Sequence, residues 1–229
     1  MSDGQVSYGA LHRLWRAGAQ ADWQAFTTHA FVEGLRDGSL PRPAFLHYLK
    51  QDYVFLIHFA RAWALAVVKS NSLEEMRMAA GTVDALVNTE MSLHIATCAK
   101  EGLSEEALFA TQEAPQNMAY TRYVMDAGLS GDYLDLMAAL APCVLGYGEI
   151  GARLLADHAP DTPYRDWIAT YGGAEYQELC AQVGAVIDRA AEARLGDLAT
   201  SPRLGALQTR FTQATTLEVG FWDMGLSGA

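Results

Sequence analysis

The chain has 229 residues, of which 51% are hydrophobic and 19% are charged, and this composition excludes an intrinsically disordered protein. Its formal net charge of -11 argues against nucleic acid and anionic membrane surfaces as partners, because both attract clustered lysine and arginine. The three cysteines, Cys98, Cys143 and Cys180, match neither a disulfide framework nor a zinc-binding pattern, so a reducing cytoplasm is the expected compartment.

In chain order, the sequence opens with residues 1–24, whose scattered charges leave no apolar core for a signal peptide. The rest is helical in pattern almost throughout, and no Asn-Gly or Asp-Gly turn separates two alternating runs. No apolar run reaches the ~20 residues that span a bilayer. The long helices are expected at residues 42–70, 73–101, 132–157 and 202–225, with a further helix after 161–163.

The expected helices have recognisable boundary residues. Ser72 and Glu75 form the pattern of a capping box before the second long helix. Further starts are expected at Ser130, 161–163 and 201–202, and stops at Gly102, 127–131 and 172–173. Because no linker or internal repeat interrupts the series, we expect one all-α helical domain over residues 1–229.

Three carboxylates occupy positions where helical spacing calls for an apolar residue: Asp52, Glu90 and Glu218. Acidic side chains are rarely buried unless they are paired, because removing a carboxylate from water is costly. A buried ion pair or a contact with a helix end is one reading of Asp52 and Glu218. No lysine or arginine lies on the same helical lines, so a functional polar cavity inside a bundle is the other.

The stretch 141–151, APCVLGYGEIG, places proline and glycine inside an apolar helical run. Interior glycine costs roughly 1 kcal/mol and interior proline about 3 kcal/mol relative to alanine. Cys143 and Tyr147, one turn apart, fall on the inward face of this run. The cysteine is either a small buried hydrophobic residue or a nucleophile, and the glycines admit either neighbouring backbone or a ligand.

Glu90 has a possible local partner in His94 at i+4, and we expect a structural pair between them. The same two residues do not indicate a metal, because di-iron bundles use repeated Glu and His pairs at i and i+3. Buried tyrosine hydroxyls need partners, so a cavity that holds tyrosines, a thiol and carboxylates would suit a flat, hydrogen-bonding heteroaromatic ligand.

These residues lie in blocks that resemble the TenA/thiaminase II family, whose members are helical bundles of the haem-oxygenase-like fold. The blocks are HAFVEGLRDGSLPRPAFLHYLKQDYVFLIHFARA, AYTRYV, LAPCVLGYGEIGARL, DWIATYGGAEYQE and TTLEVGFWDM, in the order of the family. The resemblance covers residues from about 10 to 226.

The resemblance implies roles for eight residues. Cys143 corresponds to the nucleophile, Glu218 to the acid that hydrogen-bonds the pyrimidine ring, and Asp52 to the group that holds the exocyclic amine. Aromatic residues that line or stack on the ring correspond to Phe55, Tyr120, Tyr147, Tyr171 and Phe221. Phe55 stands where family members can carry tyrosine, so a hydroxyl role is absent there. Cys143 places the chain with the cysteine-bearing group of the family.

The implied reaction is hydrolytic removal of an amine, or of the thiazole of thiamin, from the methylene of a 2-methyl-4-aminopyrimidine, through a thiolate adduct and without metal or redox cofactor. The product is 4-amino-5-hydroxymethyl-2-methylpyrimidine. The resemblance also implies a homotetramer. The alternative is a non-catalytic pyrimidine- or thiamin-binding or regulatory protein that uses the same cavity. An oxidase or di-iron oxygenase of the same fold is disfavoured by the missing Glu-x-x-His pairs.

Overall fold

The computed structural model describes residues 7–198 and 200–228, and within them every regular element is a helix. Residues 1–6, 199 and 229 of the expected domain, together with the Leu93 side chain, lie outside this description. The elements are α1 (Ala10–Gly18), α2 (Gln20–Thr27), α3 (Ala30–Asp37), α4 (Arg42–Lys69), α5 (Leu73–Asp84), η1 (Ala85–Glu90), α6 (Met91–Lys100), α7 (Glu105–Phe109), α8 (Pro115–Ser130), α9 (Tyr133–Ala156), α10 (Arg165–Gly172), α11 (Ala174–Leu195) and α12 (Leu204–Leu226).

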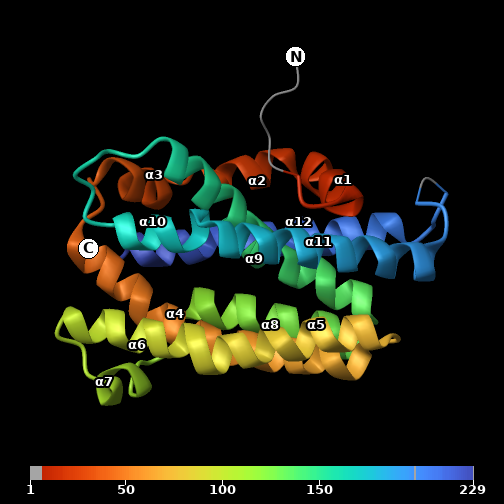
Figure 1. The fold of residues 1–229 in the computed structure, drawn as a ribbon, viewed down its shortest axis with the longest axis horizontal. Coiled ribbons are helices and arrows are strands. Elements are labelled where there is room, and N and C mark those ends of the chain that lie inside the picture. The colour runs from red at the N-terminus through yellow and green to blue at the C-terminus, as the bar shows by residue number, and fades with distance from the viewer. Residues whose placement is uncertain (1–6, 199, 229) are drawn as a thin grey trace.

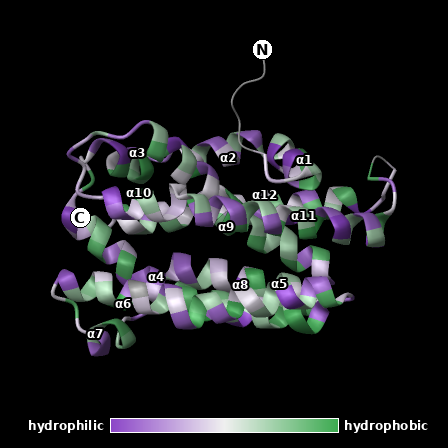
Figure 2. Cartoon of the chain, viewed as in Figure 1, coloured by the Kyte–Doolittle hydropathy of each residue, from purple (hydrophilic) through white to green (hydrophobic). Residues whose placement is uncertain are grey.

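The helices form an elongated bundle (Figure 1). One group gathers α5, α6 and α8 around α4, and the other gathers α10, α11 and α12 around α9. α9 also contacts α4 and α8, so it joins the two groups. Hydrophilic and hydrophobic residues alternate along the outer helices, as expected for helices with one buried face (Figure 2). The all-α fold class is confirmed.

α9 is the central helix of the bundle. It is long and apolar enough to cross a membrane by length and composition, which the sequence did not lead us to expect. However, 89% of its most apolar 18-residue window is buried inside the fold, as in the core helix of a globular domain. Its apolar character is therefore explained by the helices that surround it.

The glycines of α9 admit neighbouring chain segments. A methyl group on Gly146 would lie 2.2 Å from the Phe26 ring, and one on Gly151 would lie 2.3 Å from the backbone of Tyr171. A methyl group on Gly148 would meet the Cys180 sulfur at 2.6 Å. Of the two readings of this stretch, close packing is the one that the structure supports, and α9 continues through Pro142 without a break.

Three expected helix starts differ from the observed ones, those of α9, α10 and α12. Ser130 ends α8, and the N-cap of α9 is Asp132, whose carboxylate accepts from the backbone N–H groups of Leu134 and Asp135. The Asp135 carboxylate accepts from the Asp132 N–H in return, which completes a capping box two residues later than the expected start. α10 and α12 begin without a side-chain cap hydrogen bond. Ser72 does cap α5, since its hydroxyl accepts from the Glu75 N–H at 3.1 Å.

The expected single helix 73–101 is interrupted by a π-helical turn, η1. A π turn holds one more residue than an α turn, so it changes the faces that later side chains present. Glu90 is its last residue and His94 follows in α6. This turn is the main local departure from the pattern read in the sequence.

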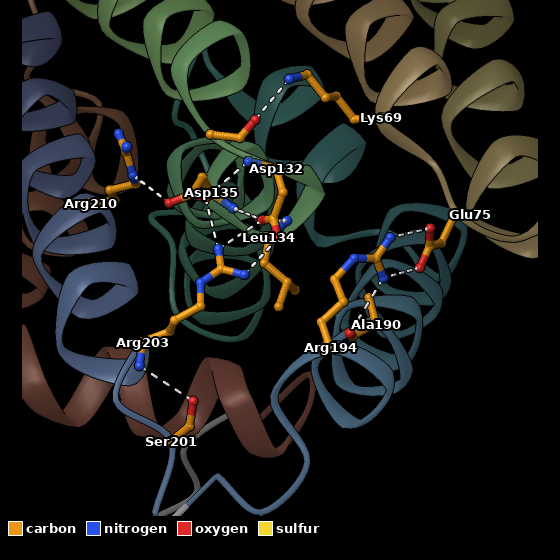
Figure 3. A network of polar contacts seen from close by, with 11 residues as sticks. Lys69, Glu75, Asp132, Leu134, Asp135, Ala190, Arg194, Ser201, Arg203 and Arg210 are labelled. Carbon is orange, nitrogen blue, oxygen red and sulfur yellow. Dashed lines mark hydrogen bonds and ion pairs between the residues drawn. The ribbon is translucent and has the colours of Figure 1, made fainter.

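Arginine and carboxylate side chains join the ends of several helices (Figure 3). Arg203, just before α12, donates to Asp132 and Asp135, and Arg210 donates to Asp135. Arg194 of α11 makes a two-pronged ion pair with Glu75 of α5. The contacts of Arg203 and Arg210 hold α12 against the start of α9, and α12 is the helix that carries Glu218.

Candidate active site

Side chains from six helical elements converge around an inner cavity of about 40 Å³ between the two helix groups. α9 supplies Cys143 and Tyr147, α4 supplies Asp52 and Phe55, and α10 supplies Tyr171. Side chains from α5, η1 and α11 complete the wall, and Glu90 of η1 is the charged one among them. Five of the eight residues expected from the sequence therefore line one cavity.

The other three expected residues lie directly behind this wall. Glu218 and Phe221 come from α12, and Tyr120 comes from α8. The Tyr120 hydroxyl donates to the Glu218 carboxylate at 2.8 Å, and the Phe221 ring meets Phe55 edge-on with centroids 5.4 Å apart. All eight residues thus form one continuous cluster.

Glu218 is only 1% exposed, and no lysine or arginine is paired with it among the described residues. Burial, with a smaller contribution from the charge of Asp52, raises the pKa of Glu218 to about 8, although hydrogen bonds with Tyr120 and Cys143 act in the opposite direction. The reading of Glu218 as half of a buried ion pair is therefore not supported. The carboxyl group can hold a proton near neutrality.

The Cys143 sulfur shares this environment. Burial raises the pKa of the Cys143 thiol well above its ordinary value, and the charges of Glu218 and Asp52 add to that effect. The resting group is consequently the thiol. Its conversion to a nucleophile requires a base, and the neighbouring carboxylate of Glu218 is a hydrogen-bonding partner of the thiol.

Asp52, rather than the expected Glu90, is the carboxylate partner of His94. Its carboxylate faces the Nδ1 atom of His94 at 3.5 Å. The opposite ring nitrogen, Nε2, donates to the Leu49 carbonyl at 2.5 Å. The expected structural pair between Glu90 and His94 is wrong, because the π turn directs His94 toward α4. Burial raises the pKa of Asp52 to about 7, and a hydrogen bond from Tyr48 opposes this rise.

Aromatic rings form much of the inner wall. Tyr147 and Tyr171 meet edge-on with centroids 5.0 Å apart, and Phe55 lies 5.4 Å from Tyr120. Such faces and edges suit a flat ring, while the hydroxyl groups and carboxylates supply hydrogen-bonding partners. Among the described residues no three His, Cys, Asp or Glu side chains converge as metal ligands.

Sequence reasoning did not identify two aromatic residues of this region. Tyr176 lines the inner cavity from α11, and its hydroxyl donates to the Val144 carbonyl at 3.3 Å. Tyr48 accepts from the Trp167 indole N–H at 3.3 Å and hydrogen-bonds Asp52. Tyr48 precedes Asp52 by one helical turn, so the i, i+4 spacing could have revealed it. No sequence pattern around Tyr176 indicates that it lines the cavity.

Known proteins resemble this chain over most of its length. The model of the TENA/THI-4/PQQC family matches residues 16–228. An aminopyrimidine aminohydrolase of Halalkalibacterium halodurans is 38% identical over 208 residues, which cover 90% of this chain and 91% of that protein. A crystal structure described as a TenA family transcription regulator from Silicibacter sp. TM1040 has a TM-score of 0.94 and 62% identity, and the match covers 96% of this chain and 98% of that one.

A second solved structure bears on the fold alone. A Shewanella denitrificans domain of unknown function with a heme oxygenase-like fold gives a TM-score of 0.72 at 13% identity. The match covers 96% of this chain and 94% of that domain. The haem-oxygenase-like architecture expected from the sequence is confirmed.

Proposed function

Because the chain belongs to the TENA/THI-4/PQQC family, we propose that it is a thiamin-related hydrolase, an aminopyrimidine aminohydrolase. The substrate would be a 2-methyl-4-aminopyrimidine with an aminomethyl group, or thiamin, and the product 4-amino-5-hydroxymethyl-2-methylpyrimidine. One observation carries the proposal: the Cys143 thiol, the Glu218–Tyr120 pair and Asp52 meet around a single cavity with aromatic walls.

Each group has a role that fits its surroundings. Protonated Glu218 donates to a ring nitrogen of the pyrimidine, and Tyr120 orients this carboxyl through its hydrogen bond. Ionised Asp52 accepts from the 4-amino group. The aromatic residues hold the ring plane between them. The sulfur of Cys143 then faces an electron-poor ring carbon next to the protonated nitrogen.

The chemistry proceeds in two halves. In the first half, Glu218 gives its proton to the ring nitrogen and accepts the thiol proton, while the sulfur forms a bond to the ring carbon. The 4-amino nitrogen next pushes its electron pair toward the ring, and the bond from the methylene to the amine breaks. The amine, which is bound as an ammonium group, leaves as neutral ammonia with that bond's electron pair.

The second half reverses the addition. Water adds its hydroxyl group to the exocyclic methylene and releases one proton, and the electron pair returns to the 4-amino nitrogen. The carbon–sulfur bond then breaks, the ring nitrogen gives up its proton and the aromatic ring is restored. The enzyme ends with the thiol and the protonated carboxyl group that it began with.

The test is incubation with 4-amino-5-aminomethyl-2-methylpyrimidine, with the hydroxymethyl product measured by chromatography. Wild type is compared with Cys143→Ala and with Cys98→Ala, which removes a buried thiol outside the cavity. Product is expected from wild type and from the Cys98 variant. Equal rates in the Cys143 variant would remove Cys143 as the nucleophile.

A second function has one observation in its favour. The Silicibacter protein, at 62% identity, is described as a transcription regulator. A regulator or binding protein could use the same cavity to recognise a pyrimidine without turnover. Tight binding of the aminomethyl pyrimidine by wild type without any product would favour this function over the hydrolase.

A further inference from the structure

We propose that a second, outer cavity receives the leaving group of the reaction and that Glu90 is its anionic contact; this inference rests on the proposed hydrolase function. The outer cavity has a volume of about 220 Å³ and lies between α4, α6 and α10. It adjoins the inner cavity, because five residues line both: Asp52, Leu56, Glu90, Tyr171 and Tyr176.

The size and polarity of the inner cavity direct the leaving group outward. Its volume of about 40 Å³ leaves no room for a leaving group beside the pyrimidine ring. Its far wall is apolar and includes Trp63, Leu179 and Val183. An aliphatic amine carries a positive charge near neutrality, and burying this charge against such a wall would be costly. The outer cavity is the side that offers room and polar groups.

Glu90 is the carboxylate at the boundary that is available to a cation. It ends the π turn η1, and its carboxylate makes no hydrogen bond or ion pair with any of the described residues. Glu101, which also lines the outer cavity, is already paired with Arg42. Asp52 faces His94 and is assigned to the 4-amino group. Glu90 therefore lacks a partner at the point where the two cavities meet.

The electrostatics of Glu90 fit this role. Burial and the charge of Asp52 raise the pKa of Glu90 to about 7. A bound ammonium group would favour the ionised carboxylate, because an opposite charge stabilises it. A neutral ligand group would give no such gain. Glu90 would thus select for substrates whose leaving group is cationic, either an ammonium group or a thiazolium ring.

The same carboxylate can complete the proton balance of the second half-reaction. An ammonium group leaves as neutral ammonia when the methylene–nitrogen bond breaks, because nitrogen keeps the electron pair. Water that adds to the methylene from this side releases one proton to Glu90. Glu90 then passes this proton to ammonia, which departs as ammonium through the outer cavity.

The experiment measures binding in a background without turnover. Cys143→Ala is combined with Glu90→Gln, with Glu90→Asp, or with Asp84→Asn as the matched control. Asp84 is an exposed carboxylate that directly precedes the π turn and lines neither cavity. Calorimetry gives Kd for two probes, the 5-aminomethyl and the 5-hydroxymethyl pyrimidine, and circular dichroism confirms that each variant is folded.

Glu90→Gln is expected to weaken binding of the aminomethyl probe by about tenfold or more, since a charge-assisted contact is lost, while binding of the hydroxymethyl probe changes less than about threefold. Glu90→Asp should recover part of the loss, and Asp84→Asn should leave both constants unchanged. Equal changes for both probes, or no change for either, would overturn the inference about Glu90. If Cys143→Ala alone binds neither probe, the proposed function itself fails.

Discussion

Three carboxyl groups around the cavities titrate near neutrality although their ordinary pKa values lie near 4. Burial is the largest cause for each, and it raises the pKa values of Asp52 and Glu90 to about 7 and that of Glu218 to about 8. The negative charge of Asp52 adds to the effect at Glu90 and Glu218, because two close carboxylates resist simultaneous ionisation. A proton can therefore be held or moved in this site at neutral pH without a histidine.

The pH dependence of kcat/KM follows from these shifts. Glu218 must be protonated to act as the acid, so activity should fall as pH rises above about 8. Asp52 must be ionised to hold the amino group, so activity should also fall below about 7. The profile should be a narrow bell, and it is measured with initial rates at constant ionic strength. Full activity at pH 10 would contradict the role of Glu218.

Replacement of Glu218 tests its role in proton transfer directly. Glu218→Gln keeps the shape of the side chain but cannot transfer a proton, so it should fold normally and lose about a hundredfold or more in kcat. Thermal unfolding serves as the control for folding. Near-normal rates in this variant would exclude Glu218 as the acid.

His12 provides a prediction outside the site. It is 1% exposed, neither ring nitrogen has a hydrogen-bond partner in the described part of the chain, and burial lowers the pKa of His12 to about 3. Below about pH 6.5, His12 binds a proton in the unfolded chain but not in the folded chain. His12 therefore lowers stability as pH falls from about 6.5 toward 3, by up to about 1.4 kcal/mol per pH unit.

His12→Leu removes this proton uptake and leaves an apolar side chain in the same position. Urea unfolding at pH 7 and pH 5 should show a smaller loss of stability in the variant than in wild type. The comparison between the two proteins cancels the contribution of the carboxylates, which both share. An identical pH dependence in the two proteins would contradict the buried neutral state of His12.

At the scale of the element, α9 and η1 show how helices depart from ideal sequence patterns for packing reasons. The glycines of α9 lower helix propensity, yet each one faces a side chain or backbone at a distance that a methyl group would not permit. The π turn of η1 likewise departs from α-helical spacing and places Glu90 on the wall that both cavities share.

Gly151→Ala should lower the free energy of unfolding by about 1–3 kcal/mol, because the added methyl group would meet the backbone of α10. Gly220→Ala in α12 is the control, since nothing lies within 4 Å of its added methyl group, and it should raise stability by up to about 1 kcal/mol. Chemical denaturation of both variants gives the comparison. Stabilisation by Gly151→Ala would refute the packing explanation.

At the scale of the whole molecule, the ion-pair network of Figure 3 holds together helices that lie far apart in the sequence. It joins the start of α9 to α12 and α5 to α11, so the ends of the two helix groups cannot separate freely. Large apolar side chains remain exposed outside this framework, among them Val68, Phe109 and Leu129. These surfaces are compatible with assembly of several copies.

We propose that the protein forms a homotetramer, as the family resemblance implies. Light scattering coupled to gel filtration should then give four times the chain mass of 24.9 kDa. Burial of exposed apolar side chains in the assembly should make the mass insensitive to moderate salt. A monomeric mass at micromolar concentration would contradict the proposal.

Much of the site could be predicted because its residues follow helical periodicity. Asp52, Cys143 and Glu218 each have apolar residues three or four positions away on the same helix face, and the structure buries these faces. The pairing of His94 with Asp52 could not be predicted in this way. It depends on the π turn and on the approach of α6 to α4, which local spacing does not encode.

By itself the sequence determined the all-α class, the inward faces of the long helices and the set of reactive side chains, because helical periodicity and burial are local properties of the chain. Only the tertiary structure decided what the glycines of α9 admit, which residue His94 faces and that Glu90 stands between two cavities. These features arise where segments distant in sequence meet, and their distances depend on how whole helices pack.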